Sequence, residues 1–240
     1  MKIVVAHPYQ QYTDFISQIP ELMEQGQCEL IYDKRNQIAR FRHDGQIFMV
    51  KRFKRVNLVQ QVVYTFFRST KCERAYRFAQ EFLSRGIATP QPIAYMEVRR
   101  LGLFTTGYFV SEEVEGTETH LLLREVQDYP KDLAEAVACQ IVLMHQKGIL
   151  HGDLNLSNFL CTKHSDGYHF TMIDINRSHF CDGMPSNEDC LKNMVRLTHR
   201  RDLYEDLVRC YARLRGWDEK VSIRKAVALL NRFENRRFRL

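Results

Sequence analysis

The segment that most constrains how this chain can fold lies at residues 143–160, where a helical pattern stops and a polar loop begins. After Gly148, which ends the helix, the loop reads His151-Gly152-Asp153, and Asn158 follows five residues after the aspartate. An apolar strand starts immediately after this asparagine. The pattern H-x-D-x4-N between a helix end and a strand is a specific signal, and it predicts a functional loop.

A second carboxylate, Asp174, stands at the end of another apolar strand, directly after Met172-Ile173. Phosphoryl transfer requires groups of these types: one carboxylate accepts the proton of a hydroxyl group, and an amide and a second carboxylate hold magnesium against the nucleotide phosphates. Hard oxygen ligands suit that ion. The loop and the strand end together therefore predict a site for phosphoryl transfer.

Hydrophobic periodicity predicts an α+β protein of two lobes. We expect an antiparallel-sheet-rich front lobe over residues 1–111, a connection at 112–116, and a mainly helical back lobe over 117–240. Strands are predicted within 29–54, near 93–98, near 103–111, near 159–162 and near 168–173. Helices are predicted at 57–68, 71–85 and 130–147, and over most of the chain after 174.

Composition restricts the class of protein and its compartment. Hydrophobic residues make up 45% of the chain, which excludes an intrinsically disordered protein. The seven cysteines are odd in number, scattered and without a CxxC pair, so neither a disulfide framework nor a zinc site is indicated. The apolar run at residues 1–8 is too short for a signal peptide, and no segment has the length of a membrane-spanning helix. We therefore expect a cytoplasmic protein.

The loop at 151–158 resembles that of the protein-kinase-like phosphotransferases, in the branch of the lipopolysaccharide core kinases that act on Kdo or heptose. The resemblance covers roughly residues 30–200, and it implies a two-lobed protein-kinase-like fold that uses ATP and Mg²⁺. It also implies that Asp153 is the catalytic base and that Asn158 and Asp174 are the magnesium ligands. Protein kinases that act on Ser or Thr usually carry Lys two places after the aspartate, where this chain has Asn155.

The front of the chain is similar to the same branch. Lys51 ends a strand as the nucleotide-binding lysine of the family does, and the resemblance implies that Glu73 pairs with it. The backbone of Glu112, Glu113 and Val114 would be the hinge that contacts adenine. The segments 70–76 and 86–90, the second reading Gly-Ile-Ala-Thr-Pro, are similar to that branch's helix and the turn after it.

Three motifs of the wider superfamily are missing from this sequence or altered in it. No G-x-G-x-x-G precedes Lys51, so the sequence leaves open how the phosphates are covered. The Phe-Gly that usually follows the metal-binding aspartate is replaced by Ile175-Asn176, with Arg177 next. No A-P-E follows Asp174, which argues against an activation loop that is regulated by phosphorylation.

Several residues have simpler interpretations. Asp153 with Asn158, or Asp174 alone, could be ordinary capping residues. Lys51 stands in a basic run and could lie on a solvated edge, and Glu73 could be a helix-surface charge that pairs with Arg77. The same catalytic groups would also serve a kinase of aminoglycosides or choline. From a different class, the chain could be a non-catalytic nucleotide-binding module.

Two basic segments suggest contact with an anionic partner. The last 50 residues hold 14 basic and 6 acidic side chains, and Arg alternates with Phe in 232–240. This pattern suits nucleic acid or an anionic glycolipid, and a solvated helix end is the plain alternative.

The helix at 57–68 has an apolar stripe between basic residues. It either packs on the sheet or lies on a membrane. With a lipopolysaccharide core glycolipid as substrate, we expect a peripheral position at the inner face of the cytoplasmic membrane, and nucleic acid is not the expected partner.

Overall fold

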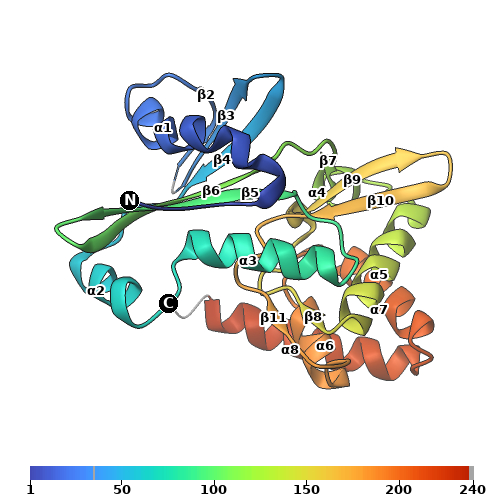
Figure 1. The fold of residues 1–240 in the computed structure, drawn as a ribbon. Coiled ribbons are helices and arrows are strands. Elements are labelled where there is room, and N and C mark those ends of the chain that lie inside the picture. Colours follow the sequence, from blue (N-terminus) through green and yellow to red (C-terminus); the bar gives the residue numbers. More distant parts are fainter. Residues whose placement is uncertain (35, 238–240) are drawn as a thin grey trace. The chain divides into compact units, whose positions relative to one another are not determined.

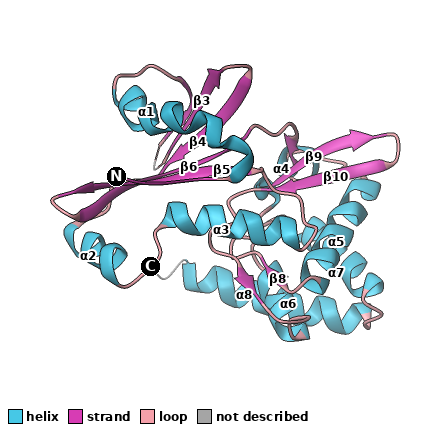
Figure 2. Cartoon of the chain, in the orientation of Figure 1, coloured by secondary structure: helices cyan, strands magenta, loops and turns pink. Residues whose placement is uncertain are grey.

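The structure is a computed structural model that describes residues 1–34 and 36–237, the side chain of residue 237 excepted. Figures 1 and 2 show its helices and strands. The chain divides into two compact units, one formed by residues 1–84 with 89–114 and the other by 85–88 with 115–240. The boundary thus lies between Val114 and Glu115. The short segment 85–88 belongs to the second unit, because Ala88 accepts a hydrogen bond from the backbone of Met172 at 2.8 Å.

A six-stranded antiparallel sheet forms the centre of the first unit, with the strand order β1-β5-β6-β4-β3-β2. The elements of this unit are β1 (Lys2–Val5), the 3-10 helix η1 (His7–Tyr12), α1 (Thr13–Glu24), β2 (Glu29–Asp33), β3 (Gln37–His43), β4 (Gln46–Arg52), α2 (Leu58–Phe66), α3 (Lys71–Ser84), β5 (Pro92–Arg100) and β6 (Leu103–Glu112). The predicted α+β class is confirmed.

The two faces of this sheet pack against different helices (Figure 1). Ile16 and Ile19 of α1 share a core with Phe48 and Val50 of β4. The opposite face carries a second core, in which Tyr76 of α3 packs with aromatic residues of β5 and β6. Because side chains alternate along a strand, the residue after Val50 on β4 points to the face that α3 covers.

The second unit is mainly helical. Its elements are β7 (Thr117–Glu118), α4 (Thr119–Leu123), α5 (Lys131–Gln146), β8 (Ile149–Leu150), the 3-10 helix η2 (Leu156–Asn158), β9 (Phe159–His164), β10 (Gly167–Met172), β11 (His179–Phe180), α6 (Asn187–Met194), α7 (Arg201–Leu214) and α8 (Glu219–Arg237). The core face of α5 is formed by Leu133, Val137, Ile141 and Met144, which are all buried. Gly148 then ends this segment with φ of 70°, a conformation that favours glycine.

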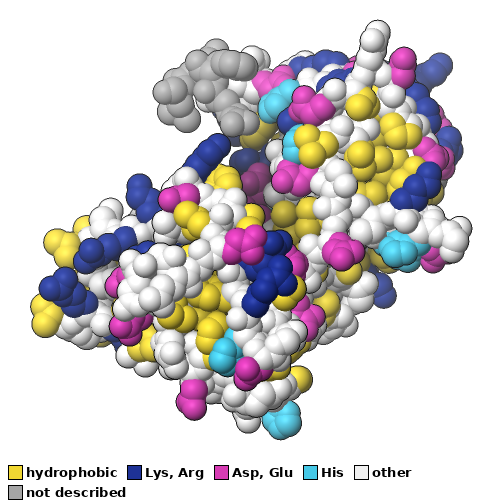
Figure 3. Space-filling model, turned by 90° about the horizontal axis from the view of Figure 1, so that it is seen from above, with side chains coloured by type: hydrophobic (Ala, Val, Ile, Leu, Met, Phe, Trp, Pro, Cys, Tyr) yellow, Lys and Arg dark blue, Asp and Glu magenta, His cyan; other side chains and the backbone are white. Residues whose placement is uncertain are grey.

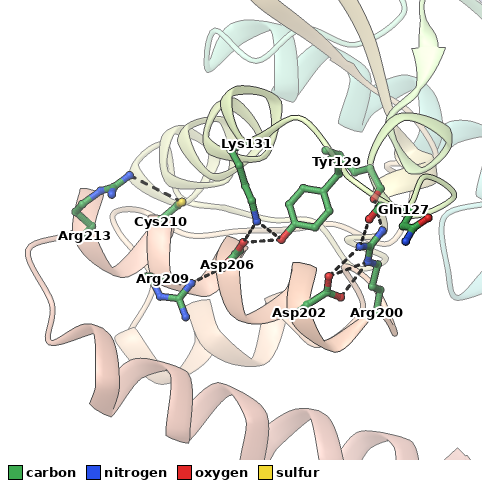
Figure 4. A network of polar contacts seen from close by, with 10 residues as sticks. Gln127, Tyr129, Lys131, Arg200, Asp202, Asp206, Arg209, Cys210 and Arg213 are labelled. Atoms are coloured by element: carbon green, nitrogen blue, oxygen red, sulfur yellow. Dashed lines mark hydrogen bonds and ion pairs between the residues drawn. The ribbon is translucent and has the colours of Figure 1, made fainter.

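A polar network ties α7 to the segment that leads into α5 (Figure 4). Lys131 Nζ lies 2.5 Å from Asp206 Oδ2 and 2.9 Å from the hydroxyl of Tyr129, which itself donates to the same carboxylate. Arg200 Nη2 donates to the backbone oxygen of Gln127 at 2.7 Å and to Asp202 at 2.9 Å. These contacts fix α7, which supplies part of the support for the loop at 151–158.

Within the described part of the chain, no helix combines the length and the apolar character that crossing a bilayer requires.

Candidate active site

The loop at 151–158 is held by a buried histidine. His151 is fully buried, and its Nε2 lies 3.0 Å from the backbone oxygen of Ile173. Its Nδ1 accepts a hydrogen bond from the backbone N–H of Asp153 at 3.2 Å. One ring nitrogen thus donates and the other accepts, as only a neutral imidazole can, and burial lowers the pKa of His151 accordingly. The histidine therefore shapes the loop.

Asn158 joins the predicted base to the predicted metal-binding strand end. Its Nδ2 donates to the backbone oxygen of Asp153 at 2.8 Å, and its own backbone oxygen accepts from the N–H of Ile173 at 3.0 Å. Asp174 is the next residue along the chain. The structure therefore brings Asp153, Asn158 and Asp174 into one site in the second unit, through backbone contacts that the sequence pattern did not reveal.

A second row of buried polar groups supports the loop from behind. Asn193 of α6 donates from Nδ2 to the backbone oxygen of His151 at 2.7 Å, and its Oδ1 lies 3.1 Å from Nε2 of His145. The other nitrogen of His145 lies 2.9 Å from the hydroxyl of Tyr211 on α7. Burial lowers the pKa of His145 to about 4, so this imidazole is neutral as well. Helices α5, α6 and α7 thus position the loop together.

Position 152, in the His-Gly-Asp sequence, requires glycine for a steric reason. A Cβ atom at residue 152 would lie 2.0 Å from the backbone oxygen of Arg177, far inside van der Waals contact. The loop packs directly on the segment that follows Asp174, and only glycine permits this approach. A residue with a side chain at this position would clash with the backbone of this chain.

Asp174 has an unusual backbone conformation. Its φ is 53°, in the left-handed region that aspartate tolerates better than most residues. Its Oδ1 lies 3.4 Å from Nδ2 of Asn176, which stands where the wider superfamily has glycine. Such conformations cost about 1 kcal/mol or more and concentrate at functional sites. The local geometry therefore agrees with a functional role for this carboxylate.

The structure adds a residue that the sequence did not single out. Arg196, two residues after α6, places Nη1 3.3 Å from Oδ1 of Asp153. Its guanidinium lies over the ring of Phe233 in α8, 4.9 Å from the ring centroid. Nothing in the local sequence marks this arginine, because it lies 43 residues from the aspartate that it contacts.

The basic C-terminal segment is partly engaged inside its own unit. Phe233 packs under Arg196, and Glu234 pairs with Arg201 at 2.6 Å and with His199 at 3.1 Å. Residues 238–240 of the predicted Arg-Phe segment lie outside the described part of the chain. In the described part of this segment, Phe233 packs against Arg196 of its own unit. This contact argues against the segment as a platform on which nucleic-acid bases stack.

The predicted nucleotide-binding residues lie on the first unit. Lys51 is on β4 between Ile38 and Phe109 of the neighbouring strands, and its Nζ lies 5.7 Å from the ring centroid of Phe53. Glu73 is in the first turn of α3, 3.9 Å from Arg77. This i,i+4 pair is the surface-charge alternative considered above, and the role of Glu73 beside Lys51 stays a prediction.

The predicted hinge residues are anchored by side-chain contacts within the first unit. Tyr9 donates to Glu112 Oε1 at 2.7 Å, and burial together with this carboxylate raises the pKa of the tyrosine. Arg40 Nε donates to Glu113 Oε1 at 2.8 Å. These contacts occupy the two side chains, and the binding of adenine by the backbone of this segment stays a prediction.

Comparisons with known proteins find similar chains among the lipopolysaccharide kinases. The family model described as "Lipopolysaccharide kinase (Kdo/WaaP) family" matches residues 42–220. A 3-deoxy-D-manno-octulosonic acid kinase of Vibrio parahaemolyticus is 24% identical over 98 residues, which are 41% of each chain. One from Haemophilus influenzae is 24% identical over 110 residues, which are 45% of this chain and 46% of the relative. The matches thus span less than half of the length of these curated relatives.

A solved structure shares the fold. The chain titled "WaaP in complex with acyl carrier protein" matches with a TM-score of 0.63 at 19% sequence identity, covering 98% of both chains. This likeness confirms the kinase-like fold that the loop at 151–158 implied. With the family model matching well over half of its length, including that loop, the chain belongs to the lipopolysaccharide kinase (Kdo/WaaP) family.

Proposed function

We propose that this protein is an ATP-dependent kinase that phosphorylates a hydroxyl group of a sugar, Kdo or heptose, in the inner core of lipopolysaccharide. The observation that carries the proposal is the loop in which His151 and Asn158 fix Asp153 beside the segment after β10 that carries Asp174. Family membership gives the reaction class and the kind of acceptor. The curated relatives are named as kinases of 3-deoxy-D-manno-octulosonic acid, which is Kdo. The solved relative is WaaP.

Asp153 is the proposed catalytic base. Its carboxylate orients the acceptor hydroxyl and takes the proton as the sugar oxygen bonds to the terminal phosphorus of ATP. The bond from that phosphorus to the bridging oxygen breaks, and ADP leaves. Arg196, 3.3 Å from the carboxylate, holds it in one orientation and adds positive charge where phosphate oxygens would gather.

The donor atoms at the site fit magnesium. Nδ2 of Asn158 is committed to the backbone oxygen of Asp153, which leaves Oδ1 as the amide atom that can bind a cation. The carboxylate of Asp174 supplies further hard oxygen ligands. The ion, when bound, offsets the negative charge of the nucleotide phosphates.

The proposed nucleotide-binding residues lie on the first unit. Lys51 would steady the phosphates with Glu73, and the backbone of residues 112–114 would bind adenine.

The proposed acceptor is anchored in lipid, so we place the enzyme in the cytoplasm, at the inner face of the cytoplasmic membrane. Nucleic acid is not a proposed partner. The nearest rivals are a kinase of soluble small molecules, such as aminoglycosides or choline, and a nucleotide-binding module without catalysis.

The test is an acceptor panel with labelled ATP and magnesium. Deep-core glycolipid, free sugars, aminoglycosides and a generic protein are offered to the wild type, to Asp153→Asn and to Asp182→Asn, whose exposed carboxylate serves as the matched control. We expect label in the glycolipid with the wild type and the control, and none with Asp153→Asn, which still binds nucleotide. Label only in aminoglycoside or protein would contradict the acceptor class, and nucleotide binding without any transfer would favour the non-catalytic module.

A further inference from the structure

Helix α2 packs on the sheet with its polar side. Gln61 is only 9% exposed, and its Nε2 donates to the backbone oxygen of Val56 at 3.2 Å. Thr65 Oγ1 accepts from the backbone N–H of Phe104 on β6 at 2.9 Å and donates to the oxygen of Gln61 at 2.6 Å. Tyr64 adds an edge-to-face contact with the ring of Phe104. These bonds hold the helix against the start of β6.

The apolar side of the helix therefore faces outward. Two rows with a spacing of four residues form it, and the helix geometry places both rows on one face. These residues, called the α2 apolar face below, are Leu58, Val62 and Phe66 in one row and Val59, Val63 and Phe67 in the other. All six are exposed, Phe66 by 68% and Phe67 by 81%. A contiguous exposed apolar face of this kind marks an interaction surface, and packing against the sheet does not account for it.

The charged residues next to this face along the chain have one sign. The sequence from Phe53 to Cys72 contains no Asp or Glu. Lys54 and Arg55 precede the helix and Arg68 follows it, and all three are exposed. An anionic partner is therefore complementary to this surface, and a basic one is not.

A neighbouring turn extends the same surface. The turn between β5 and β6 precedes Phe104, to which α2 is bonded, and Figure 1 shows α2 beside this end of the sheet. At its tip Leu101 is 98% exposed, with Arg99 and Arg100 exposed next to it. In the view of Figure 3, yellow and dark blue side chains lie together at the left end of the molecule. The tip repeats the combination of apolar and basic groups found on α2.

We infer that the α2 apolar face and Leu101 form a membrane-binding surface, which inserts into the interface of a bilayer with anionic headgroups. An amphipathic helix with aromatic residues on its apolar side and cations at its borders lies in the plane of such an interface. The cations bind the negative surface, while Phe66 and Phe67 leave water for the acyl boundary. The purpose of this surface rests on the proposed function, since it would bring the enzyme to a lipid-anchored acceptor. The binding itself requires neither nucleotide nor catalysis.

The first measurement is sedimentation with vesicles in the absence of ATP. Vesicles of phosphatidylcholine are compared with vesicles that also contain phosphatidylglycerol. We expect binding to the anionic vesicles that weakens with salt, and a loss of about tenfold or more in the Phe66→Ser, Phe67→Ser variant. Lys54→Glu with Arg55→Glu should also weaken it. Leu121→Ser with Met184→Ser removes exposed apolar side chains elsewhere and serves as the matched control, with binding unchanged.

The second measurement separates this inference from the proposed function. The Phe66→Ser, Phe67→Ser variant should phosphorylate a delipidated, water-soluble acceptor at the wild-type rate and a vesicle-embedded acceptor more slowly. Vesicle binding without any transfer would overturn the proposed function and leave the membrane surface in place. Equal vesicle binding by the wild type and this variant would overturn the membrane surface. The membrane surface would also be overturned if the wild type formed a dimer, or a complex with an acidic protein, that the variant did not form, while neither the wild type nor the variant bound vesicles.

Discussion

Arg196 and Asp153 form an ion pair in which Nη1 lies 3.3 Å from Oδ1, and the guanidinium also lies over the ring of Phe233. The pair joins the proposed catalytic base to α8 through a single side chain. Because both members are partly exposed, with side-chain exposures of 40% and 28%, solvent screens the attraction. Its main effect is therefore to orient the carboxylate.

Replacing Arg196 should slow the reaction without preventing folding. We expect Arg196→Ala to lower kcat by about tenfold, which corresponds to roughly 1.4 kcal/mol in the barrier, with little change in KM for ATP. Arg196→Lys should recover part of the rate, because it keeps the charge and loses the planar contact with the ring. Steady-state kinetics and a thermal melt check this. An unchanged kcat would show that the ion pair has no role in catalysis.

Asn193 offers a test of the support behind the loop. Asn193→Leu removes the donor to the His151 oxygen and the acceptor for His145, and leaves buried polar groups without partners. The free energy of unfolding should fall by about 2–4 kcal/mol, and activity should fall with it. Denaturant titration measures the first effect. Asn187→Ala, at an exposed position of the same helix, should leave both unchanged; equal losses in the two variants would refute the specific role of Asn193.

Gly152 tests the steric argument. The methyl group of Gly152→Ala would require the loop or the segment at Arg177 to move, since it would lie only 2.0 Å from the backbone oxygen of that arginine. We expect loss of activity by at least about a hundredfold, because misplacement of a catalytic group by about 1 Å has that effect. Gly183→Ala, where a Cβ atom would meet nothing within 4 Å, is the matched control. Full activity of Gly152→Ala would show that the loop is not held where the structure has it.

The buried histidines predict a pH dependence of stability. The pKa of His145 is lowered from 6.5 to about 4, so between these values the unfolded chain binds a proton that the folded chain does not. The free energy of unfolding therefore rises with pH in this window. The contribution of His145 is fully present above about pH 6.5, and roughly 3 kcal/mol is lost on acidification to pH 4. His151, whose pKa is also lowered, adds to the same trend.

Unfolding titrations at several pH values measure this slope. His145→Gln should flatten it, while His179→Gln, at an exposed position, should not. A slope that is identical in all three proteins would mean that His145 is not the titrating group.

Much of the fold was predictable from the sequence because its strongest patterns are local. The helix at 130–147 and the strands around 93–111 show clear periodicity or ends marked by Gly and Pro, and they were found within one or two residues of their predicted bounds. Helix α1 was not predicted: it follows a short 3-10 helix and contains Pro20, so its start and period are weak signals.

The candidate site was predictable only where its residues are close in sequence. Asp153 and Asn158 share one loop, and Asp174 follows the next hairpin. Arg196 and Asn193 come from α6 and its end, about 40 residues away, and only the folded chain brings them to the loop. The sequence also did not decide whether the apolar stripe of α2 packs on the sheet or faces outward. Periodicity identifies an apolar stripe and does not say what covers it.

The measurement that tests the central claim most directly is the transfer of phosphate from ATP to purified inner-core glycolipid, followed by mass spectrometry of the product. The account predicts one added phosphate ester on a Kdo or heptose hydroxyl with the wild type, and none with Asp153→Asn although that variant still folds and binds nucleotide. A glycolipid left unmodified by the folded, nucleotide-bound wild type, or modified equally by Asp153→Asn, would contradict it.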